Sequence, residues 1–286
     1  MTTGAARRRR APRWPSFIVR DRGGLTGAVL LGVVVLIALL GPAFAPDPST
    51  AILGTPGHGP AGGAPLGLDF IGRDVFSRLL DGGRSTLLMG GSATVLIYLA
   101  GIAVGLTAGY VQSLADPLLM RAVDVVLSFP ALLVMLLFVT AFGGGSVVLV
   151  GAAALVLFPG VARIVRTATT EVMTRNYVEA AISWGERGFA IMRREVLPNI
   201  IAPIVADLGI RFSWAIILIA SVNYLGLGLR PPTADWGLMI SENRAIISSN
   251  PLSVLAPAAV LALLVIAVNL VGDAYVRHFG RSGDDR

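Results

Sequence analysis

The residue types that most often catalyse reactions or bind metals are scarce in this chain. It has no cysteine and no lysine, since all 23 basic residues are arginine, and His58 and His278 lie far apart. Without lysine there is no phosphate-binding P-loop and no Schiff-base chemistry, and without cysteine there are no disulfides or thiolate metal sites. The sequence therefore predicts no catalytic residues and no metal site, and it excludes the chain as an ATPase.

One segment is distinguished by its spacing rather than by reactive groups. It reads Glu179-Ala180-Ala181, then Gly185, and later Leu197-Pro198-Asn199. Asn176 is a suitable N-cap three positions before the glutamate, as in a capping box, and alanine has the highest helix propensity. We predict a helix of about two turns that stops at Gly185, then a second segment that ends at Leu197-Pro198.

A helix this short is marginal alone in water, so it needs a partner surface. Ala180 and Ala181 permit a close approach within a groove, and Tyr177, Val178 and Trp184 offer apolar contacts. Long apolar runs flank the segment on both sides. A shift of the partner groove would therefore move the flanking helices.

This segment resembles the loop by which membrane permease subunits of ABC importers dock on their ATPase partners. Each fixed position of that signature has its counterpart here, in Glu179, Ala180, Ala181, Gly185, Leu197 and Pro198. Glu195 occupies a variable position that is often isoleucine or histidine. The resemblance implies ATPase-coupling roles for these residues and for Asn199. It also implies that ATP and Mg bind to the partner ATPase and that this chain binds no cofactor.

Further segments resemble the dipeptide, oligopeptide and nickel branch of these permeases. They lie at residues 65–80, 120–130, 225–237 and 269–273. Leu68 stands where threonine is usual, and the short segment after the first apolar run is more similar to the second permease of such systems than to the first. The resemblance implies a type I importer permease fold. It also implies a complex with a second permease subunit, ATPase subunits and an extracytoplasmic substrate-binding protein.

The composition is typical of a membrane protein. The chain is 55% hydrophobic and 14% charged, with a mean hydropathy of +0.76, whereas soluble domains average about 25% charged residues. A net charge of +6 would favour nucleic acid if the arginines formed one face. They lie between apolar runs instead, so we predict contact with a lipid bilayer and no nucleic-acid partner.

Apolar runs of about 20 residues predict an all-α, polytopic membrane protein with six transmembrane helices. The predicted spans are residues 25–45, 85–115, the two halves of 125–162, 203–229 and 251–272. Gly143-Gly144-Gly145 divides residues 125–162 and predicts a tight hairpin between the third and fourth spans.

These spans divide the chain into five parts. They are a cytoplasmic arginine-rich tail at 1–24, a first transmembrane helix at 25–45, an external loop at 46–84, a five-helix permease core at 85–276 with a coupling loop at 167–200, and a cytoplasmic tail at 277–286. Seventeen arginines lie on the side of the two ends and the coupling loop, and five lie on the other. This bias predicts that both termini are cytoplasmic in the cell membrane. The first apolar run is longer than a signal-peptide core and is followed by Pro46, which favours an uncleaved anchor.

A few polar and small residues within the spans carry specific expectations. Asp207 and Arg211 are four apart, so they can form an ion pair on one helix face. Asn223, deep in the fifth span, is the candidate for a pore-facing group on the substrate pathway. Glycine recurs every fourth residue from Gly101 to Gly109, which predicts close approach of a helix from this or a partner subunit.

The sequence therefore predicts a permease subunit of an ATP-driven importer, with di- or oligopeptides as the favoured cargo. Nickel or another small solute remains an alternative, because cargo choice is expected in the binding protein and a few pore residues. His58, in a glycine- and proline-rich loop, is predicted to be solvated rather than a ligand. A self-sufficient channel or ion-driven carrier is the alternative from another class. The docking-type loop and the lack of buried acidic relays argue against it.

Overall fold

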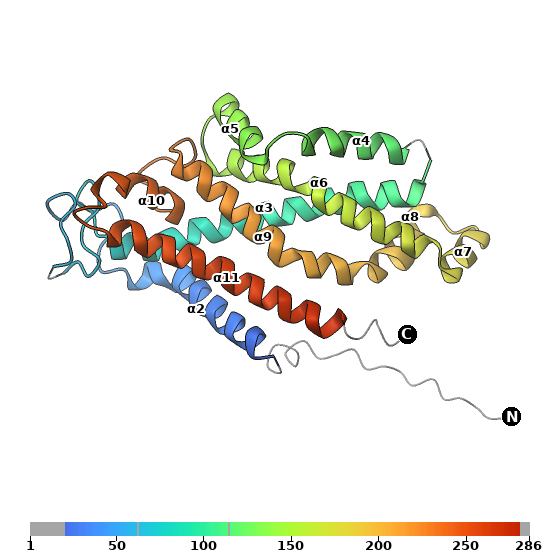
Figure 1. The fold of residues 1–286 in the computed structure, drawn as a ribbon, viewed down its shortest axis with the longest axis horizontal. Coiled ribbons are helices and arrows are strands. Elements are labelled where there is room, and N and C mark those ends of the chain that lie inside the picture. Colours follow the sequence, from blue (N-terminus) through green and yellow to red (C-terminus); the bar gives the residue numbers. More distant parts are fainter. Residues whose placement is uncertain (1–20, 62, 114, 281–286) are drawn as a thin grey trace.

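The computed structural model describes residues 21–280 except 62 and 114 (Figure 1). Within these residues the chain is helical, and its β-structure is limited to three isolated bridges in the segment 52–74. Five helices are long and apolar enough to cross a membrane, and a bent pair supplies a sixth span if it is counted as one. The predicted all-α, multi-span fold class is confirmed.

The elements form a bundle with short helices at both ends (Figure 1). The membrane-length elements are α2 (Arg22–Phe44), α3 (Val75–Val111), the pair α4 (Ala115–Leu127) and α5 (Ala131–Phe142), α6 (Ser146–Met173), α9 (Ile201–Tyr224) and α11 (Leu252–Gly280). At one end α7 (Asn176–Ser183), α8 (Gly188–Ile191), the π-helix η1 (Met192–Val196) and the 3₁₀ helix η2 (Leu197–Asn199) join α6 to α9. At the other end α10 (Trp236–Asn243) and the 3₁₀ helix η3 (Arg244–Ile246) join α9 to α11. The segment that precedes α3 lies beside α10.

The second span begins earlier than its hydropathy predicts. The structure starts α3 at Val75, so the predicted loop at 46–84 is wrong beyond residue 74. Asp74 caps the helix, because its carboxylate accepts hydrogen bonds from the backbone N–H groups of Phe76 and Ser77. The predicted tail at 277–286 also begins too early, since α11 continues to Gly280. The rest of that tail and residues 1–20 lie outside the described residues.

The third span is bent rather than straight. The glycine triplet at 143–145 separates α5 from α6 as predicted, but α4 and α5 meet at an angle of 84°. Pro130 follows Phe129 at this break, and proline has no N–H to continue a helix and disfavours helical angles in the residue before it. The sequence prediction treated this stretch as one apolar helix and so missed the bend.

The glycine repeat of α3 lies against α6, its most extensive helix contact. A Cβ atom added at Gly101 would lie 2.6 Å from Cβ of Val161, and one added at Gly109 would lie 2.6 Å from Cβ of Thr169. Gly105 is buried between them. Small residues at this spacing allow two helices to approach closely in lipid. The predicted close contact is confirmed, and its partner is a helix of the same chain.

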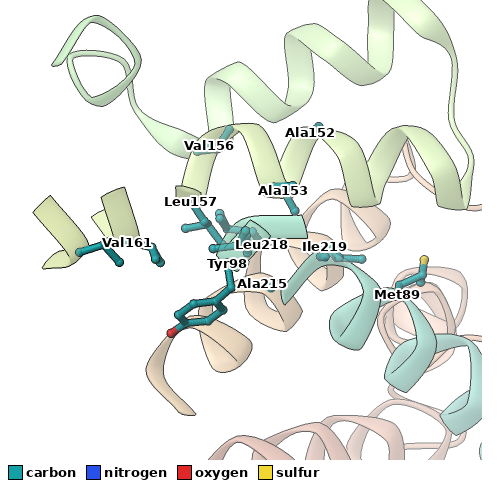
Figure 2. Packing of buried hydrophobic residues seen from close by; sticks show 14 of the residues in the cluster. Met89, Tyr98, Ala152, Ala153, Val156, Leu157, Val161, Ala215, Leu218 and Ile219 are labelled. Carbon is teal, nitrogen blue, oxygen red and sulfur yellow. The ribbon is translucent and has the colours of Figure 1, made fainter. Parts of the chain in front are cut away.

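The largest cluster of buried hydrophobic side chains lies between α3, α6 and α9 (Figure 2). Ile97 and Ala153 are fully buried there. Beside the cluster, Asp207 accepts hydrogen bonds from Nε of Arg211 at 2.8 Å and from the hydroxyl of Tyr98 at 3.0 Å, which confirms the predicted ion pair. These three helices therefore connect the two ends of the bundle through a close-packed interior.

Candidate functional site

The helix α7 carries the first half of the sequence signature. Its N-cap is Arg175 rather than Asn176, and no side chain caps it, so the predicted capping box is wrong. Glu179 lies in the first turn, where its negative charge favours the positive end of the helix dipole. The Glu179 side chain is exposed, and no ion pair in the described chain involves it. The carboxylate is therefore available to a partner.

The helix ends at a glycine in a left-handed conformation. Gly185 has φ of +77° and donates its N–H to the carbonyl of Ile182 at 2.9 Å, while Glu186 donates to the carbonyl of Ala181 at 3.2 Å. These two bonds form a Schellman motif, which satisfies carbonyls left free at a helix end. Glycine is required because other residues adopt this φ only at a cost. The predicted stop at Gly185 is confirmed.

The second half of the signature does not end at Leu197-Pro198 as predicted. Helical turns continue through η1 and η2 directly into α9. Pro198 fits because it lies in the first turn of η2, where a missing N–H costs little. Asn199 donates its side-chain amide to the carbonyl of Glu195 at 2.6 Å, a bond that satisfies one carbonyl of the widened turn. The segment is thus joined to α9 without an intervening loop.

One face of residues 174–200, which we call the coupling segment, belongs to the core of the bundle. Val178, Ile191, Val196 and Ile200 are buried to 1% exposure or less, and they join the cluster between α3, α6 and α9. Ala181 is also buried. The expectation that Val178 is available to a partner is therefore wrong. This face fixes the segment to the helices that it would have to move.

The opposite face exposes large apolar side chains. Trp184 is 82% exposed and Phe189 is 72% exposed, and Ile182 and Tyr177 are more than two-fifths exposed. Exposed apolar side chains that gather at one place mark interaction sites. Pro198 and Asn199 are also exposed, whereas Ala180 and Leu197 are half-buried. Ile182 and Phe189 were not predicted as contacts from the sequence, since apolar residues three and four positions from Gly185 give no local sign of which side they face.

The coupling segment also contacts the end of α3. A Cβ atom added at Gly188, the first residue of α8, would lie 2.8 Å from the hydroxyl oxygen of Tyr110 near the end of α3. The segment therefore contacts α3 through Gly188, α6 through the chain itself and α9 through η2. The segment is thus attached to all three helices of the core.

A second candidate site is an apolar groove of about 600 Å³ between α5, α9, α10 and α11. This volume lies within the usual range of ligand pockets. Residues that line it include Leu132, Ile217, Ser221, Tyr224, Ile240 and Val265. Only the hydroxyls of the serine and the tyrosine among these are polar. The groove can therefore hold a largely apolar surface with few directional contacts.

Asn223, the predicted pore-facing group, does not line this groove. It is fully buried, and its side-chain amide donates to Asp235 Oδ1 at 2.8 Å while its side-chain oxygen accepts from the N–H of Leu229 at 2.9 Å. Asp235 also accepts the hydroxyl hydrogen of Thr86 at 2.7 Å. The structure thus gives Asn223 an internal role, in holding the connection between α9 and α10 against α3.

Neither candidate site, as far as the described residues line it, contains a group of potential metal ligands. Among the described residues, no three histidine, aspartate or glutamate side chains come together in a way that could hold a metal ion. His58 is exposed in the loop before α3. What the arrangement offers is a surface for a protein partner at one end and an apolar groove toward the other.

Comparison with known proteins decides between a channel and a permease. Residues 101–282 match the family described as binding-protein-dependent transport system inner membrane component. The chain belongs to this family. It is therefore an ABC importer permease, a transport subunit with several membrane-spanning helices.

Relatives of this permease are similar over most of its length. The di/tripeptide transport system permease protein DppC of Pseudomonas aeruginosa is 38% identical over 91% of this chain and 88% of that protein. The glutathione transport system permease protein GsiD of Pectobacterium atrosepticum is 37% identical over 76% of this chain and 72% of the length of that protein. The dipeptide permease DppC of Haemophilus influenzae is 33% identical over 90% of each.

A solved structure has the same fold. A chain from inward-facing conformations of the MetNI methionine ABC transporter matches with a TM-score of 0.59, and the match covers 70% of this permease and 95% of that chain. At 20% identity this likeness concerns the fold alone. The permease fold expected from the sequence is confirmed.

Proposed function

We propose that this permease is one of two membrane subunits of an ATP-driven importer of di- or oligopeptides, and that it forms half of the translocation pathway. The named cargo of its relatives, di- and tripeptides, dipeptides and glutathione, supports a peptide cargo. The other members of the complex are a second permease subunit, ATPase subunits that bind ATP and Mg, and an extracytoplasmic substrate-binding protein.

The coupling segment is the docking element for the ATPase. The observation that carries this proposal is its two-sided burial, with Val178 fully buried in the bundle core and Trp184 82% exposed a few residues away. Glu179, Ala180, Ala181, Gly185, Leu197, Pro198 and Asn199 are the residues assigned to this role. A mechanical link requires an outer face that binds the ATPase and an inner face that is fixed to the pore helices.

The end of the bundle that carries α7 faces the cytoplasm. The arginine bias in the sequence supports this orientation, and the described chain starts and finishes toward the same end (Figure 1). Nη2 of Arg277 near the end of α11 lies 2.6 Å from Oδ2 of Asp21 before α2. In this orientation both termini are cytoplasmic, the protein lies in the cell membrane, and α10 lies at the outer side.

The apolar groove forms part of the wall of the substrate pathway, because it opens among α5, α9, α10 and α11 rather than within the packed core. Asn223 affects this pathway from behind the wall, through Asp235 at the start of α10. Peptide side chains vary in size and polarity, so an apolar wall with few fixed hydrogen-bond donors suits a varied cargo.

Uptake and co-purification together test this proposal. In cells that lack the chain, restoring it should restore ATP-dependent uptake of labelled dipeptide and leave nickel uptake unchanged. The ATPase should co-purify with the wild type and be lost with Glu179→Arg or with Gly185→Pro, since proline cannot adopt a φ of +77°. Nickel uptake that depends on the chain would overturn the cargo, and retention of the ATPase by both variants would overturn the docking role.

A further inference from the structure

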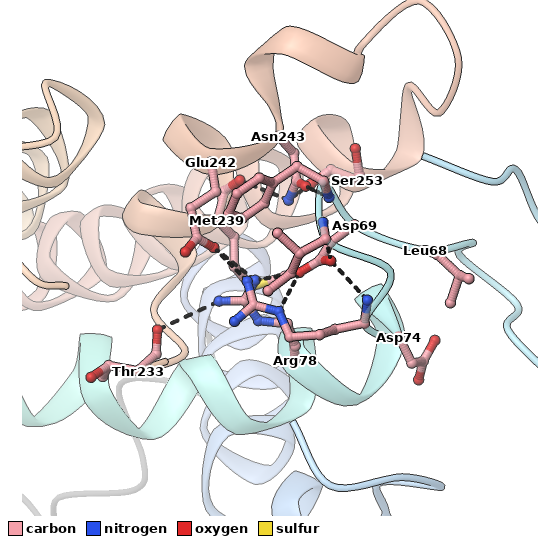
Figure 3. Close-up of polar contacts among 12 residues, drawn as sticks. Leu68, Asp69, Asp74, Arg78, Thr233, Met239, Glu242, Asn243 and Ser253 are labelled. Atoms are coloured by element: carbon pink, nitrogen blue, oxygen red, sulfur yellow. Dashed lines mark hydrogen bonds and ion pairs between the residues drawn. The ribbon is translucent and has the colours of Figure 1, made fainter. Parts of the chain in front are cut away.

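Asp69, Arg73, Arg78 and Glu242 form ion pairs in the interior at the α10 end of the bundle, and Figure 3 labels three of them, Asp69, Arg78 and Glu242. Nη1 of Arg78 donates to Asp69 Oδ2 at 2.6 Å and to Glu242 Oε2 at 2.7 Å, and Nε of Arg73 donates to Asp69 Oδ2 at 2.7 Å. The side chains of Asp69 and Arg78 are fully buried, and that of Glu242 is 6% exposed. Two positive and two negative charges balance, which makes their burial tolerable.

This cluster joins three parts of the chain. Arg78 lies in the first turn of α3, Asp69 lies in the segment before it, and Glu242 lies near the end of α10. The start of α10 is also attached to α3, because Nε1 of Trp236 donates to the carbonyl of Leu79 at 2.8 Å. The short helix is thus held to the long one at both of its ends.

The same short helix forms one wall of the apolar groove. Gly237 and Ile240 of α10 line that groove. A Cβ atom added at Gly237 would lie 2.9 Å from Cα of Ala220 on α9, so α10 also lies close against the helix that supplies more of the groove's lining than any other. Where α10 sits therefore sets the width of the groove.

Stability alone is a weak reason for this cluster. Replacing a buried ion pair by well-packed hydrophobic residues is often neutral or stabilising. Moreover, Nε of Arg78 and Oε1 of Glu242 are buried without hydrogen-bond partners among the described residues, so the cluster does not use its full bonding capacity. What charged groups supply and apolar ones do not is a fixed direction and register between the elements they join.

We propose that Asp69, Arg78 and Glu242 are positioning residues for transport, which clamp α10 to α3 so that the groove wall moves with that helix. This inference rests on the proposed function. The 37 residues of α3 span about 55 Å at about 1.5 Å per residue. Tyr110 contacts the coupling segment at one end of α3, and Arg78 holds α10 at the other. A displacement of the coupling segment by the ATPase would thereby be transmitted through α3 to the wall of the groove.

The test is the ratio of peptide transported to ATP hydrolysed by the reconstituted complex. Glu242→Gln keeps the side-chain shape and removes the charge. It should leave ATPase binding and hydrolysis near the wild-type level and lower the ratio by about fivefold. The matched control is Asp124→Asn, which removes the exposed partner of Arg163 between α4 and α6 and should not change the ratio. An unchanged ratio in Glu242→Gln would overturn the proposal.

A distance measurement tests the clamp without transport. The chain has no cysteine, so nitroxides can be placed at Arg84→Cys on α3 and Arg244→Cys after α10, both exposed. The distance distribution should be narrow in the nucleotide-free and ATP-bound complex and broader in Glu242→Gln. Equal distributions would contradict the clamp. If the glutamine variant does not assemble, Arg78→Lys, which keeps the charge but loses the fork geometry, should give the same two changes.

Failure of the clamp and failure of the proposed function are distinguishable. If the wild-type complex shows no ATP-driven peptide uptake, the proposed function is wrong, while the nitroxide distances still support or refute the clamp. Conversely, Glu179→Arg should lose the ATPase with α10 in place, whereas Glu242→Gln should keep the ATPase with α10 released.

Discussion

Nη1 of Arg78 on α3 lies 2.7 Å from Oε2 of Glu242 on α10, although the two residues are 164 positions apart in the sequence. At the opposite end of α3, Tyr110 lies against Gly188 of the coupling segment. One helix therefore contacts both the surface that we assign to the ATPase and the wall of the apolar groove. This geometry gives each end of the permease a distinct set of testable residues.

Removing the most exposed aromatic side chain of the coupling segment should weaken ATPase binding and leave the fold intact. Buried aromatic anchors dominate many interfaces, so we expect Trp184→Ala to raise the Kd for the ATPase by about tenfold or more. The Tm of the isolated permease should not change, because Trp184 is 82% exposed. Trp214→Ala on α9, where the side chain is 50% exposed, is the control. Equal Kd values for the two variants would refute the anchor role.

Two faces of α3 should respond differently to a glycine-to-alanine substitution. A Cβ atom at Gly105 would lie 2.7 Å from Cβ of Val165, whereas one at Gly91 meets nothing within 4 Å. Overpacking costs about 1–3 kcal/mol, so Gly105→Ala should lower the Tm and the yield of the complex. Gly91→Ala should be neutral or stabilising, since alanine favours helices over glycine by up to about 1 kcal/mol. Thermal unfolding in detergent checks both, and equal shifts would contradict the close α3–α6 contact.

Asn223 should matter for stability more than for cargo. Asn223→Leu leaves Asp235 Oδ1 and the N–H of Leu229 without their hydrogen bonds to this side chain. The N–H of Leu229 would then be unsatisfied, at a cost of about 1–3 kcal/mol, whereas Asp235 Oδ1 still accepts from the N–H groups of Gly237 and Leu238. We expect a lower Tm and less assembled complex, with the order of preference among labelled peptides unchanged. A changed peptide preference at normal stability would instead place Asn223 on the pathway.

The ionic cluster predicts a specific acid sensitivity. Burial opposes ionisation of Asp69, but hydrogen bonds from the backbone N–H groups of Arg73 and Ile71 and the charge of Arg73 outweigh it, so the pKa of Asp69 lies below its ordinary value of 3.8. The pKa of Asp69 is lower in the folded than in the unfolded protein. The stabilisation by ionised Asp69 is therefore fully present above the unfolded pKa and is lost as the pH falls through the folded pKa. The Tm difference between wild type and Asp69→Asn should therefore stay constant from about pH 7 to about pH 5 and shrink below pH 3.8. A difference that persists undiminished in acid would contradict this assignment.

Local signals predicted part of the site and part of the fold. The stop at Gly185 was readable because a left-handed residue after a helix strongly favours glycine, and the multi-span architecture was readable from apolar length. The early start of α3 at Val75 was not, because Arg78 and Asp81 made its first turns appear polar. The end predicted at Leu197-Pro198 was also wrong, because Pro198 lies in the first turn of η2, where its missing N–H costs little, and helical turns continue on both sides.

By itself the sequence determined local features, namely the apolar spans, the glycine repeat of α3 and the residue spacing from Glu179 to Asn199 that resembles a docking loop. Only the tertiary structure decided which residues meet across the bundle. In the folded chain Val178 is buried and Trp184 is exposed, Asn223 lies outside the lining of the groove, and Glu242 contacts Arg78. The physical reason is that the sequence around a charged or amide side chain does not show which residue it will pair with. The free energy of such a side chain depends on its burial and on groups contributed by distant segments.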